Sequence, residues 1–514
     1  MLGCCRSSPR SIRSRPCRSN RQSRQGGWTV ARRASRHRHR RAVAASRRIV
    51  TVAVSAVATV TLGIGYVAGD LTDVVPGVLT LQPMRIPTVP SARTARAAAS
   101  VLADADRSIP VDAAAADALI DTFLGSEGVG SDVSIAIAGA DGTVVAERNA
   151  DIVREPASTL KTLTAVAAAT VLDLSDTLDT ETYLIQQEGQ TPTLVLKGNG
   201  DMLLGAGVSD PDHVNGRAGL GTLAAQSAAA LRQRGIDRIR LVYDDTLFGG
   251  QRYPSRIEEN NPDNLYYAPV SALAVDGGRN WNGDPPDDPD LYTGYAELST
   301  QPAADAAATF ATRLAENGIA VDGEVTSGAA PQGQSPLTSV SSAQLNEIMA
   351  FMMRHSDNTL AEEFGRLTAL AAGRENSPHG ATQAVAATLQ ELGVDTAQLT
   401  MADCSGLAPG SSLSVRTLIG VQSRILAGGA GSVVAGALSV PGLIGTAAGR
   451  LDDESVAGLL RVKTGTLGTV TSMTGNVSRL NGGVLCFAVV VNNPENAWEA
   501  AHAVDVFMAD LPGM

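Results

Sequence analysis

A charge-free stretch from Ile49 to Ala68 divides the chain into two parts that cannot fold in the same way. Its length of about 20 residues is what an α-helix needs to cross the apolar core of a bilayer. Residues 1–48 before it hold 15 Arg and no acidic residue, and such an arm stays on the cytoplasmic side. We therefore expect 1–48 to be a basic, disordered arm and 49–68 to be a transmembrane signal-anchor helix.

Three other interpretations of this region stay open. A cleaved signal peptide would release the rest of the chain as a secreted protein, although Tyr66-Val67-Ala68 is a poor cleavage site. A buried core helix is the second interpretation. The third is a nucleic-acid-binding arm, which requires that 49–68 does not span a membrane. Contact of the arginines with anionic lipid explains the arm more simply, so we expect a single-pass membrane protein without a nucleic-acid partner.

The rest of the 514 residues divides by composition. Scattered prolines make 69–110 a predicted stalk. Residues 111–175 form a first globular part, 176–336 a strand-rich insertion and 337–514 a second globular part. We found no internal repeat. The predicted elements include strands at Val133–Ala138, Thr469–Val477 and Val484–Val491, and helices at Ser158–Leu172 and Ser342–His355.

Lysine is the residue type whose use most needs explaining. The chain has 38 Arg but only three Lys, at positions 161, 197 and 463. An amine can lose its proton when its surroundings lower its pKa, whereas a guanidinium cannot. Lysines kept in an arginine-rich chain are therefore candidates for a proton acceptor. We interpret Lys197 as a structural residue of the insertion.

Lys161 lies in the motif Ser158-Thr159-Leu160-Lys161. On a helix the i, i+3 spacing brings the Ser158 hydroxyl and the Lys161 amine to one face, within reach of each other. A neutral amine there could take the hydroxyl proton and make the oxygen nucleophilic. Backbone N–H groups at the helix start would face developing negative charge. The pair alone is weak evidence because the motif is short.

A second motif, Lys463-Thr464-Gly465-Thr466, falls on a predicted strand. Alternate side chains of a strand face the same side, so Lys463 and Gly465 would point one way and both threonines the other. If this strand forms one edge of a binding site, a bulge or twist is needed for side chains from both faces of the strand to reach the site. Gly465 would leave room for substrate to lie against the strand.

Ser356-Asp357-Asn358 stands between the two motifs, after a predicted apolar helix. The order SxxK, SxN, KTG matches the signature set of penicillin-binding proteins and β-lactamases. With its long gap between Ser158 and Ser356, the chain resembles a class C, low-molecular-mass penicillin-binding protein of the D-alanyl-D-alanine carboxypeptidase/endopeptidase family. Three further stretches share the resemblance: 197–201, 266–280 and 403–407. Met202 and Cys404 depart from the family pattern, which usually has Pro and Gly there.

The resemblance implies an α/β (α+β) transpeptidase fold of the serine β-lactamase type, an antiparallel sheet flanked by helices, with the insertion between SxxK and SxN. Residues 111–175 and 337–514 would together make the catalytic domain. The implied activity is a penicillin-sensitive, serine-type carboxypeptidase or endopeptidase that acts on peptidoglycan stem peptides. β-Lactams would be inhibitors, and no cofactor would be needed.

The resemblance also assigns roles to residues. Ser158 would be the acylated nucleophile, Lys161 its proton acceptor and Ser356 the relay of a proton to the leaving D-alanine. Asn358 would hold the substrate amide and Lys463 would shape the electrostatics of the cleft. The hydroxyls of Thr464 and Thr466 would bind the terminal carboxylate, beside Gly465. Backbone N–H groups of Ser158 and Thr466 would form the oxyanion hole.

Two competing functions remain at this stage. A β-lactamase would hydrolyse the acyl-enzyme quickly, but no separate Glu motif suggests the base it needs. A non-catalytic, membrane-anchored peptidoglycan-binding protein of the same fold would not need complete motifs. The histidines show no metal-ligand spacing and no GxSxG elbow occurs, so we expect no metal. Whether Cys404 and Cys486 form a disulfide stays open.

Overall fold

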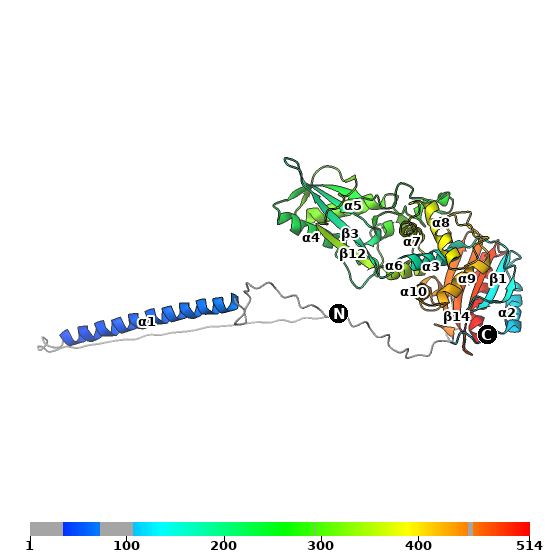
Figure 1. Cartoon of the computed structure of the whole chain (residues 1–514), viewed down its shortest axis with the longest axis horizontal. Helices are drawn as coiled ribbons and strands as arrows, with labels where there is room; N and C mark the ends of the chain where they lie inside the picture. The colour runs from blue at the N-terminus through cyan, green and yellow to red at the C-terminus, as the bar shows by residue number, and fades with distance from the viewer. Residues whose placement is uncertain (1–33, 72–105, 293, 451–455) are drawn as a thin grey trace, which may run out of the picture. The chain divides into compact units, whose positions relative to one another are not determined.

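A computed structural model describes residues 34–71, 106–292, 294–450 and 456–514. Most of the predicted basic arm and stalk lie outside these residues. Helix α1 runs from Ala34 to Leu71 (Figure 1). Its segment Ala53–Leu71 is long and apolar enough to cross a membrane, with a mean hydropathy of 1.5. The charge-free stretch therefore lies within one helix, and the helix is a unit separate from residues 102–514.

The first sheet of the globular unit is antiparallel and joins the two ends of that unit. Its central strand β15 reads VLCFAVVVN and is buried along nearly its whole length, because helices cover both faces of the sheet. Val133 of β1 pairs with Val491 of β15, so the first and last strands among the described residues lie side by side. The sheet order is β13 (Leu460–Leu467), β14 (Val470–Ser478), β15 (Val484–Asn492), β1 (Val133–Gly139) and β2 (Val144–Arg148).

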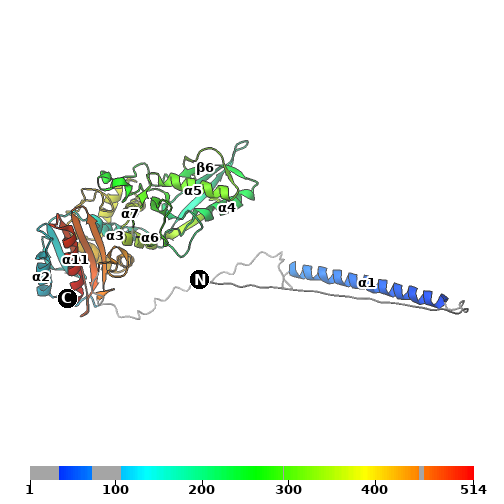
Figure 2. The ribbon, with the colours of Figure 1, turned by 180° about the vertical axis from the view of Figure 1, so that it is seen from behind.

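Helices cover this sheet on both faces, as the family resemblance implied. Figure 2 shows α2 and α11 together on one face, where the rings of Phe123 and Phe507 lie 5.5 Å apart. On the other face α9 packs on β1 and β15, and α3 packs on α7, α8 and α9. The helices are α2 (Ala113–Leu124), α3 (Lys161–Val171), α6 (Leu345–His355), α7 (Asn358–Ala371), α8 (Pro378–Glu391), α9 (Val415–Leu426), α10 (Ala430–Ala437) and α11 (Ala497–Asp510).

Two predicted helix starts differ from the structure. The helix predicted from Ser342 begins at Leu345, because Thr338–Gln344 is strand β12 and pairs with β3. Gln344 and Glu347 form a capping box that fixes this start. The helix predicted from Ser158 begins with a 3₁₀ turn, Ala157–Leu160, before α3. Helix α10 was not predicted.

The region between the first two motifs builds a second, mixed sheet with its own apolar core. In Figure 1 this sheet and helices α4 and α5 lie at the end of the globular unit opposite the first sheet, with α3, α6 and α7 between them. Its elements are β3 (Thr177–Ile185), β4 (Thr193–Lys197), α4 (Leu220–Arg232), β6 (Arg238–Asp244), α5 (Pro302–Glu316), β10 (Ala320–Val321), β11 (Thr326–Ser327) and β12 (Thr338–Gln344). Two small sheets pair β5 (Asp201–Leu204) with β7 (Leu273–Val275) and β8 (Arg279–Asn280) with β9 (Glu297–Leu298).

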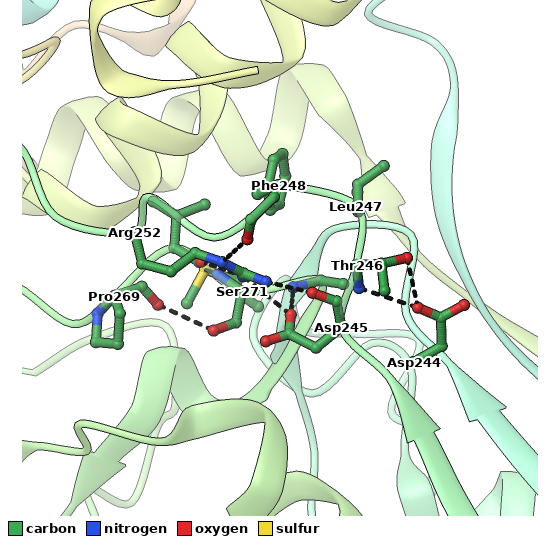
Figure 3. Close-up of polar contacts among 12 residues, drawn as sticks. Asp244, Asp245, Thr246, Leu247, Phe248, Arg252, Pro269 and Ser271 are labelled. Carbon is green, nitrogen blue, oxygen red and sulfur yellow. Dashed lines mark hydrogen bonds and ion pairs between the residues drawn. The ribbon is translucent and has the colours of Figure 1, made fainter. Parts of the chain in front are cut away.

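A polar cluster holds the segment that leaves the second sheet after β6 (Figure 3). The Arg252 guanidinium donates to the Asp245 carboxylate at 3.1 Å and to the Val270 carbonyl at 2.7 Å. The same Asp245 oxygen accepts from the backbone N–H of Ala272 at 2.6 Å. These contacts close the loop between residues 245 and 272, and so they fix the path of Tyr266, which lies within it and contacts the site described below.

Three buried carboxyl groups lie where the second sheet region meets α7. Asp201, Glu362 and Glu363 are each at most 2% exposed. Burial raises the pKa of Asp201 to about 7 and that of Glu362 to about 8. Burial, and then the neighbouring Asp201, raises the pKa of Glu363 as well. Because the folded state favours the protonated acids, their contribution to stability is full below pH 4 and is lost as the pH rises through their folded pKa values.

We predict that Asp201→Asn reduces the pH dependence of stability. The amide oxygen can still accept the hydrogen bond from the Leu203 N–H, which measures 2.9 Å, but it does not ionise. Between pH 5 and pH 7 the wild type should lose about 2 kcal/mol more unfolding free energy than the variant. Urea denaturation at both pH values measures this, with the exposed Asp237→Asn as the control. Equal losses in wild type and variant would contradict the prediction.

Candidate active site

Ser158 lies in the 3₁₀ turn that precedes α3. The turn begins at Ala157, which has a positive φ of 49°, a conformation that costs free energy for a residue with a Cβ. Thr159 holds the turn by donating its hydroxyl to the Pro156 carbonyl at 2.7 Å. The tight turn brings the Ser158 hydroxyl to the end of a buried helix.

Lys161 is fully buried and its amine has three oxygen neighbours. The Nζ atom lies 2.9 Å from Ser158 Oγ, 2.6 Å from Asn358 Oδ1 and 2.9 Å from the Ser405 carbonyl. Burial lowers the pKa of Lys161 to about 8, although the nearby carboxylates of Asp403 and Asp357 oppose the shift. A substantial fraction of this lysine is therefore neutral near pH 8.

The neighbours of Lys161 orient its lone pair. A neutral amine has two N–H bonds and one lone pair. The Asn358 Oδ1 and Ser405 carbonyl oxygens can only accept, so they take the two N–H bonds. The remaining direction points to Ser158, whose hydroxyl can donate to the lone pair. This arrangement fits proton transfer from Ser158 to Lys161.

The SxN motif forms the junction between α6 and α7. Ser356 ends α6 in the left-handed conformation, with φ of 57°, and Asp357 caps α7 by accepting from the Leu360 N–H at 2.9 Å. Asn358 uses both ends of its amide, because its Nδ2 also donates to the Tyr266 carbonyl at 2.8 Å. The sharp turn brings Ser356 and Asn358 into the same site.

Lys463, on strand β13, contacts the SxN motif. Its Nζ donates to Ser356 Oγ at 2.9 Å and to the Thr464 carbonyl at 2.8 Å. Burial, and then repulsion by Lys161, lowers the pKa of Lys463. Among the residues that the structure describes, neither lysine forms an ion pair with a carboxylate.

Strand β13 is an edge strand and pairs with β14 without a register shift. The Thr464 hydroxyl oxygen lies 2.7 Å from that of Thr446, and Thr466 is exposed. A Cβ added to Gly465 would lie 2.9 Å from the Pro156 carbonyl and 3.1 Å from the Ser158 backbone nitrogen. The missing side chain at Gly465 therefore lets β13 lie against the turn that carries Ser158. The expected room for substrate at Gly465 stays a prediction.

Comparison with known proteins identifies the family. A model of the D-Ala-D-Ala carboxypeptidase 3 (S13) family matches residues 116–282 and 292–511. The chain is a member of this family. It is 33% identical over 365 residues to a carboxypeptidase of Mycobacterium tuberculosis, over 69% of this chain and 75% of that protein. It is 31% identical over 358 residues to the carboxypeptidase DacB of Mycolicibacterium smegmatis, over 68% of this chain and 73% of that protein.

Solved structures show the same fold. Penicillin binding protein 4 of Haemophilus influenzae has a TM-score of 0.63 and 21% identity, over 77% of this chain and 99% of that chain. Together with the family match, this confirms the resemblance that the three motifs indicated and the predicted fold class. The S13 chain is therefore a penicillin-binding peptidoglycan peptidase.

Several residues of the S13 site were not identified from the sequence. Asp403 accepts from the backbone N–H of Gly406 at 2.7 Å and from that of Leu407 at 3.2 Å, which fixes the turn that presents the Ser405 carbonyl to Lys161. The stretches 266–280 and 403–407 were recognised only as family-like, without a role. Thr446 carried no sequence signal, because it lies in no motif.

Three residue types considered in the sequence analysis can now be placed. Cys404 and Cys486 are both buried and both free thiols. Lys197 pairs with Glu181 at 3.3 Å. His213 lies with two aspartates, 288 and 290, and ligand atoms of the three lie within 4.8 Å of one another, a grouping that sequence spacing did not indicate.

We predict that Gly465→Ala slows acylation of the S13 site. The new methyl group would collide with Ser472 Oγ and press on the Ser158 backbone, and a misplacement of about 1 Å can cost on the order of 100-fold in rate. Stopped-flow acylation by a fluorescent penicillin measures the effect. Gly250→Ala is the control, because its Cβ would meet no atom within 4 Å. An unchanged acylation rate in Gly465→Ala would contradict the prediction, because it would show that β13 can move to accommodate the methyl group without displacing Ser158.

Proposed function

We propose that the chain is a penicillin-sensitive D-alanyl-D-alanine carboxypeptidase/endopeptidase that works through an acyl-enzyme on Ser158. The observation that carries the proposal is the 2.9 Å contact between Ser158 Oγ and the Nζ of a fully buried Lys161. A buried amine with a lowered pKa is a base that functions near neutral pH. The family supplies the substrate class, the stem peptides of peptidoglycan.

In the first step Ser158 Oγ attacks the carbonyl carbon of the penultimate D-alanine while Lys161 takes the hydroxyl proton. The negative charge that develops on the carbonyl oxygen needs hydrogen-bond donors. The backbone N–H groups of Ser158 and Thr466 fit this role, because β13 and the 3₁₀ turn lie in contact at Gly465. The tetrahedral intermediate then loses its C–N bond, and the acyl group stays on Ser158.

The leaving amine must receive a proton as the C–N bond breaks. Ser356 is suited to deliver it, since its hydroxyl is hydrogen-bonded to Lys463 Nζ at 2.9 Å. The Thr464 and Thr466 hydroxyls would bind the carboxylate of the leaving D-alanine, and Asn358 would hold the substrate amide. Water then attacks the acyl-enzyme, with Lys161 as the base, and releases the shortened peptide.

The competing functions are less well supported. A β-lactamase hydrolyses its acyl-enzyme quickly, and the sequence shows no separate Glu motif for the base of that fast step. The buried Glu362 is not suited to this, because its raised pKa keeps it protonated and its Oε2 accepts from the Cys404 N–H at 3.0 Å. A non-catalytic binding protein would gain nothing from two buried lysines, whose desolvation costs free energy.

We further propose that α1 anchors the protein in the cell membrane, with the catalytic part outside the cytoplasm. The support is the apolar segment Ala53–Leu71 behind the arginine-rich arm. The expected result is that the protein stays in the membrane pellet after alkaline carbonate washing, whereas a chain starting at Leu102 is soluble. Release of the full chain by carbonate, or a mature N-terminus after residue 68, would contradict the anchor.

We predict a stable one-to-one adduct of the full chain with benzylpenicillin in intact-mass spectra, and none with Ser158→Ala. Persistence of the adduct would argue against a β-lactamase. Release of D-alanine from a pentapeptide is the matching assay of turnover. A folded wild type with neither adduct nor turnover would favour the non-catalytic binding protein.

The rate of adduct formation should depend on pH through Lys161. Only the neutral amine accepts the proton, so the rate should rise about tenfold per pH unit below pH 8 and level off above it. Lys161→Arg keeps a cation that cannot lose its proton, so its rate should fall by roughly 10²–10⁴-fold at every pH. A flat profile in the wild type would exclude Lys161 as the base.

A further inference from the structure

A large cavity opens beside the proposed active site. Its volume is about 930 Å³ and its lining is mostly apolar, near the upper end of the roughly 300–1,000 Å³ found for pockets that hold drug-sized ligands. Helices α6 and α10 and the segments around Leu291 and Ile444 form its walls. A single D-alanine is far too small to fill it.

The cavity lies on the leaving-group side of the site. His355, which lines it, directly precedes Ser356, the residue suited to protonate the leaving amine. Thr446 also lines it, and its hydroxyl oxygen is 2.7 Å from that of Thr464. A chain that continues beyond the leaving residue would therefore enter this cavity.

The two carboxylates that line the cavity have hydrogen-bond or ion-pair partners, whereas the guanidinium that lines it has no ion-pair partner among the described residues. The Asp290 carboxylate accepts from the backbone N–H groups of Val214 at 2.9 Å and Asn215 at 2.8 Å. Glu347 pairs with Arg217 at 2.9 Å. Arg354 forms no ion pair with any residue that the structure describes.

The Arg354 guanidinium also has a hydrogen-bond donor without a partner among the described residues. One of its terminal nitrogens donates to the Gly436 carbonyl at 2.8 Å, but its Nε is buried without a partner. Asn346, another lining residue, has a buried Oδ1 that also lacks a partner. Buried polar atoms of this kind are rare in folded proteins, and a guanidinium matches a carboxylate in geometry and charge.

One wall of the cavity lies outside the residues that the family model matches. The family match omits residues 283–291, and Asp290 and Leu291 from that segment line the cavity. The backbone carbonyl of Asp290 lies 2.9 Å from His355 Nε2, and the His355 ring stacks on Tyr292 at 4.4 Å. This segment and Tyr292 thus contact His355, the residue next to the SxN motif.

We propose that this cavity is a leaving-group subsite that receives the second peptide of a cross-link, with Arg354 binding a carboxylate of that peptide. The inference rests on the proposed function. The scissile bond joins a D-alanine carbonyl to an amine of the second stem peptide. Ser158 Oγ bonds to the carbonyl carbon, the C–N bond breaks, and the departing nitrogen takes a proton. Water then releases the first peptide, so the net reaction is hydrolysis of the cross-link.

The test compares two substrates on the full chain in detergent. One is a pentapeptide that loses D-alanine, and the other is a cross-linked peptide dimer with free carboxylates on its leaving half. Arg354→Gln should lower the ratio of kcat/KM for dimer over pentapeptide by roughly 10- to 100-fold, mainly through KM, the effect of losing a charge-assisted hydrogen bond. A dimer with amidated carboxylates on its leaving half should not respond to the substitution.

Arg461→Gln is the matched control, because Arg461 is a neighbouring cation that does not line the cavity. It should leave the ratio unchanged. Ala350→Phe, which places a ring in the cavity, should lower the ratio without removing a charge. Benzylpenicillin acylation reports separately on Ser158 and on folding.

An unchanged ratio in both Arg354→Gln and Ala350→Phe would overturn the subsite. An equal loss on both substrates would also overturn it, since Arg354 would then support the whole site. If benzylpenicillin does not acylate the wild type, the proposed function is refuted instead. These outcomes separate the two claims.

Discussion

The burial of two lysines in one small volume is the constraint on which the site depends. Lys161 and Lys463 are both fully buried, and removing an ammonium from water without a counter-ion is costly. The protein meets this cost by surrounding each amine with neutral oxygens and by lowering both pKa values. The lowered pKa of Lys161 makes its amine able to accept a proton near neutral pH. The hydrogen bonds of the two lysines also connect three chain segments, 158–161, 356–358 and 463–465.

The local part of this arrangement could be predicted from the sequence. The spacing of Ser158 and Lys161 means that any helical turn brings the two side chains together, and they meet at 2.9 Å. The strands of the first sheet were predictable for the same reason, because a run such as VLCFAVVVN is long and apolar enough to be a strand covered on both faces. Where one turn or one strand decides the geometry, sequence is sufficient.

The remaining part depends on contacts between distant segments. The acceptors that orient Lys161 and Asn358 include the backbone carbonyls of Ser405 and Tyr266. Because every residue has a backbone carbonyl, no pattern of side chains in the sequence predicts which ones take this role. The atoms that a Cβ on Gly465 would meet belong to Ser472 on the paired strand and to Pro156 and Ser158 in the turn before α3, so they are distant in sequence. The cavity is built from α6, α10 and two loops. Before the fold is known, neither its volume nor the lack of an ion-pair partner for Arg354 among the described residues can be inferred.

The pairing of β1 with β15 has a consequence for when the protein becomes active. Val133 of β1 pairs with Val491 of β15. Lys463, which donates to Ser356, lies on β13, two strands from β15 in the same sheet. Contacts between such distant positions form slowly, because a long loop must be closed first. During synthesis, which starts at the N-terminus, Ser158 is therefore present long before the strands that complete the site. A hydrolase of the wall thus has no working site until its last strands are in place.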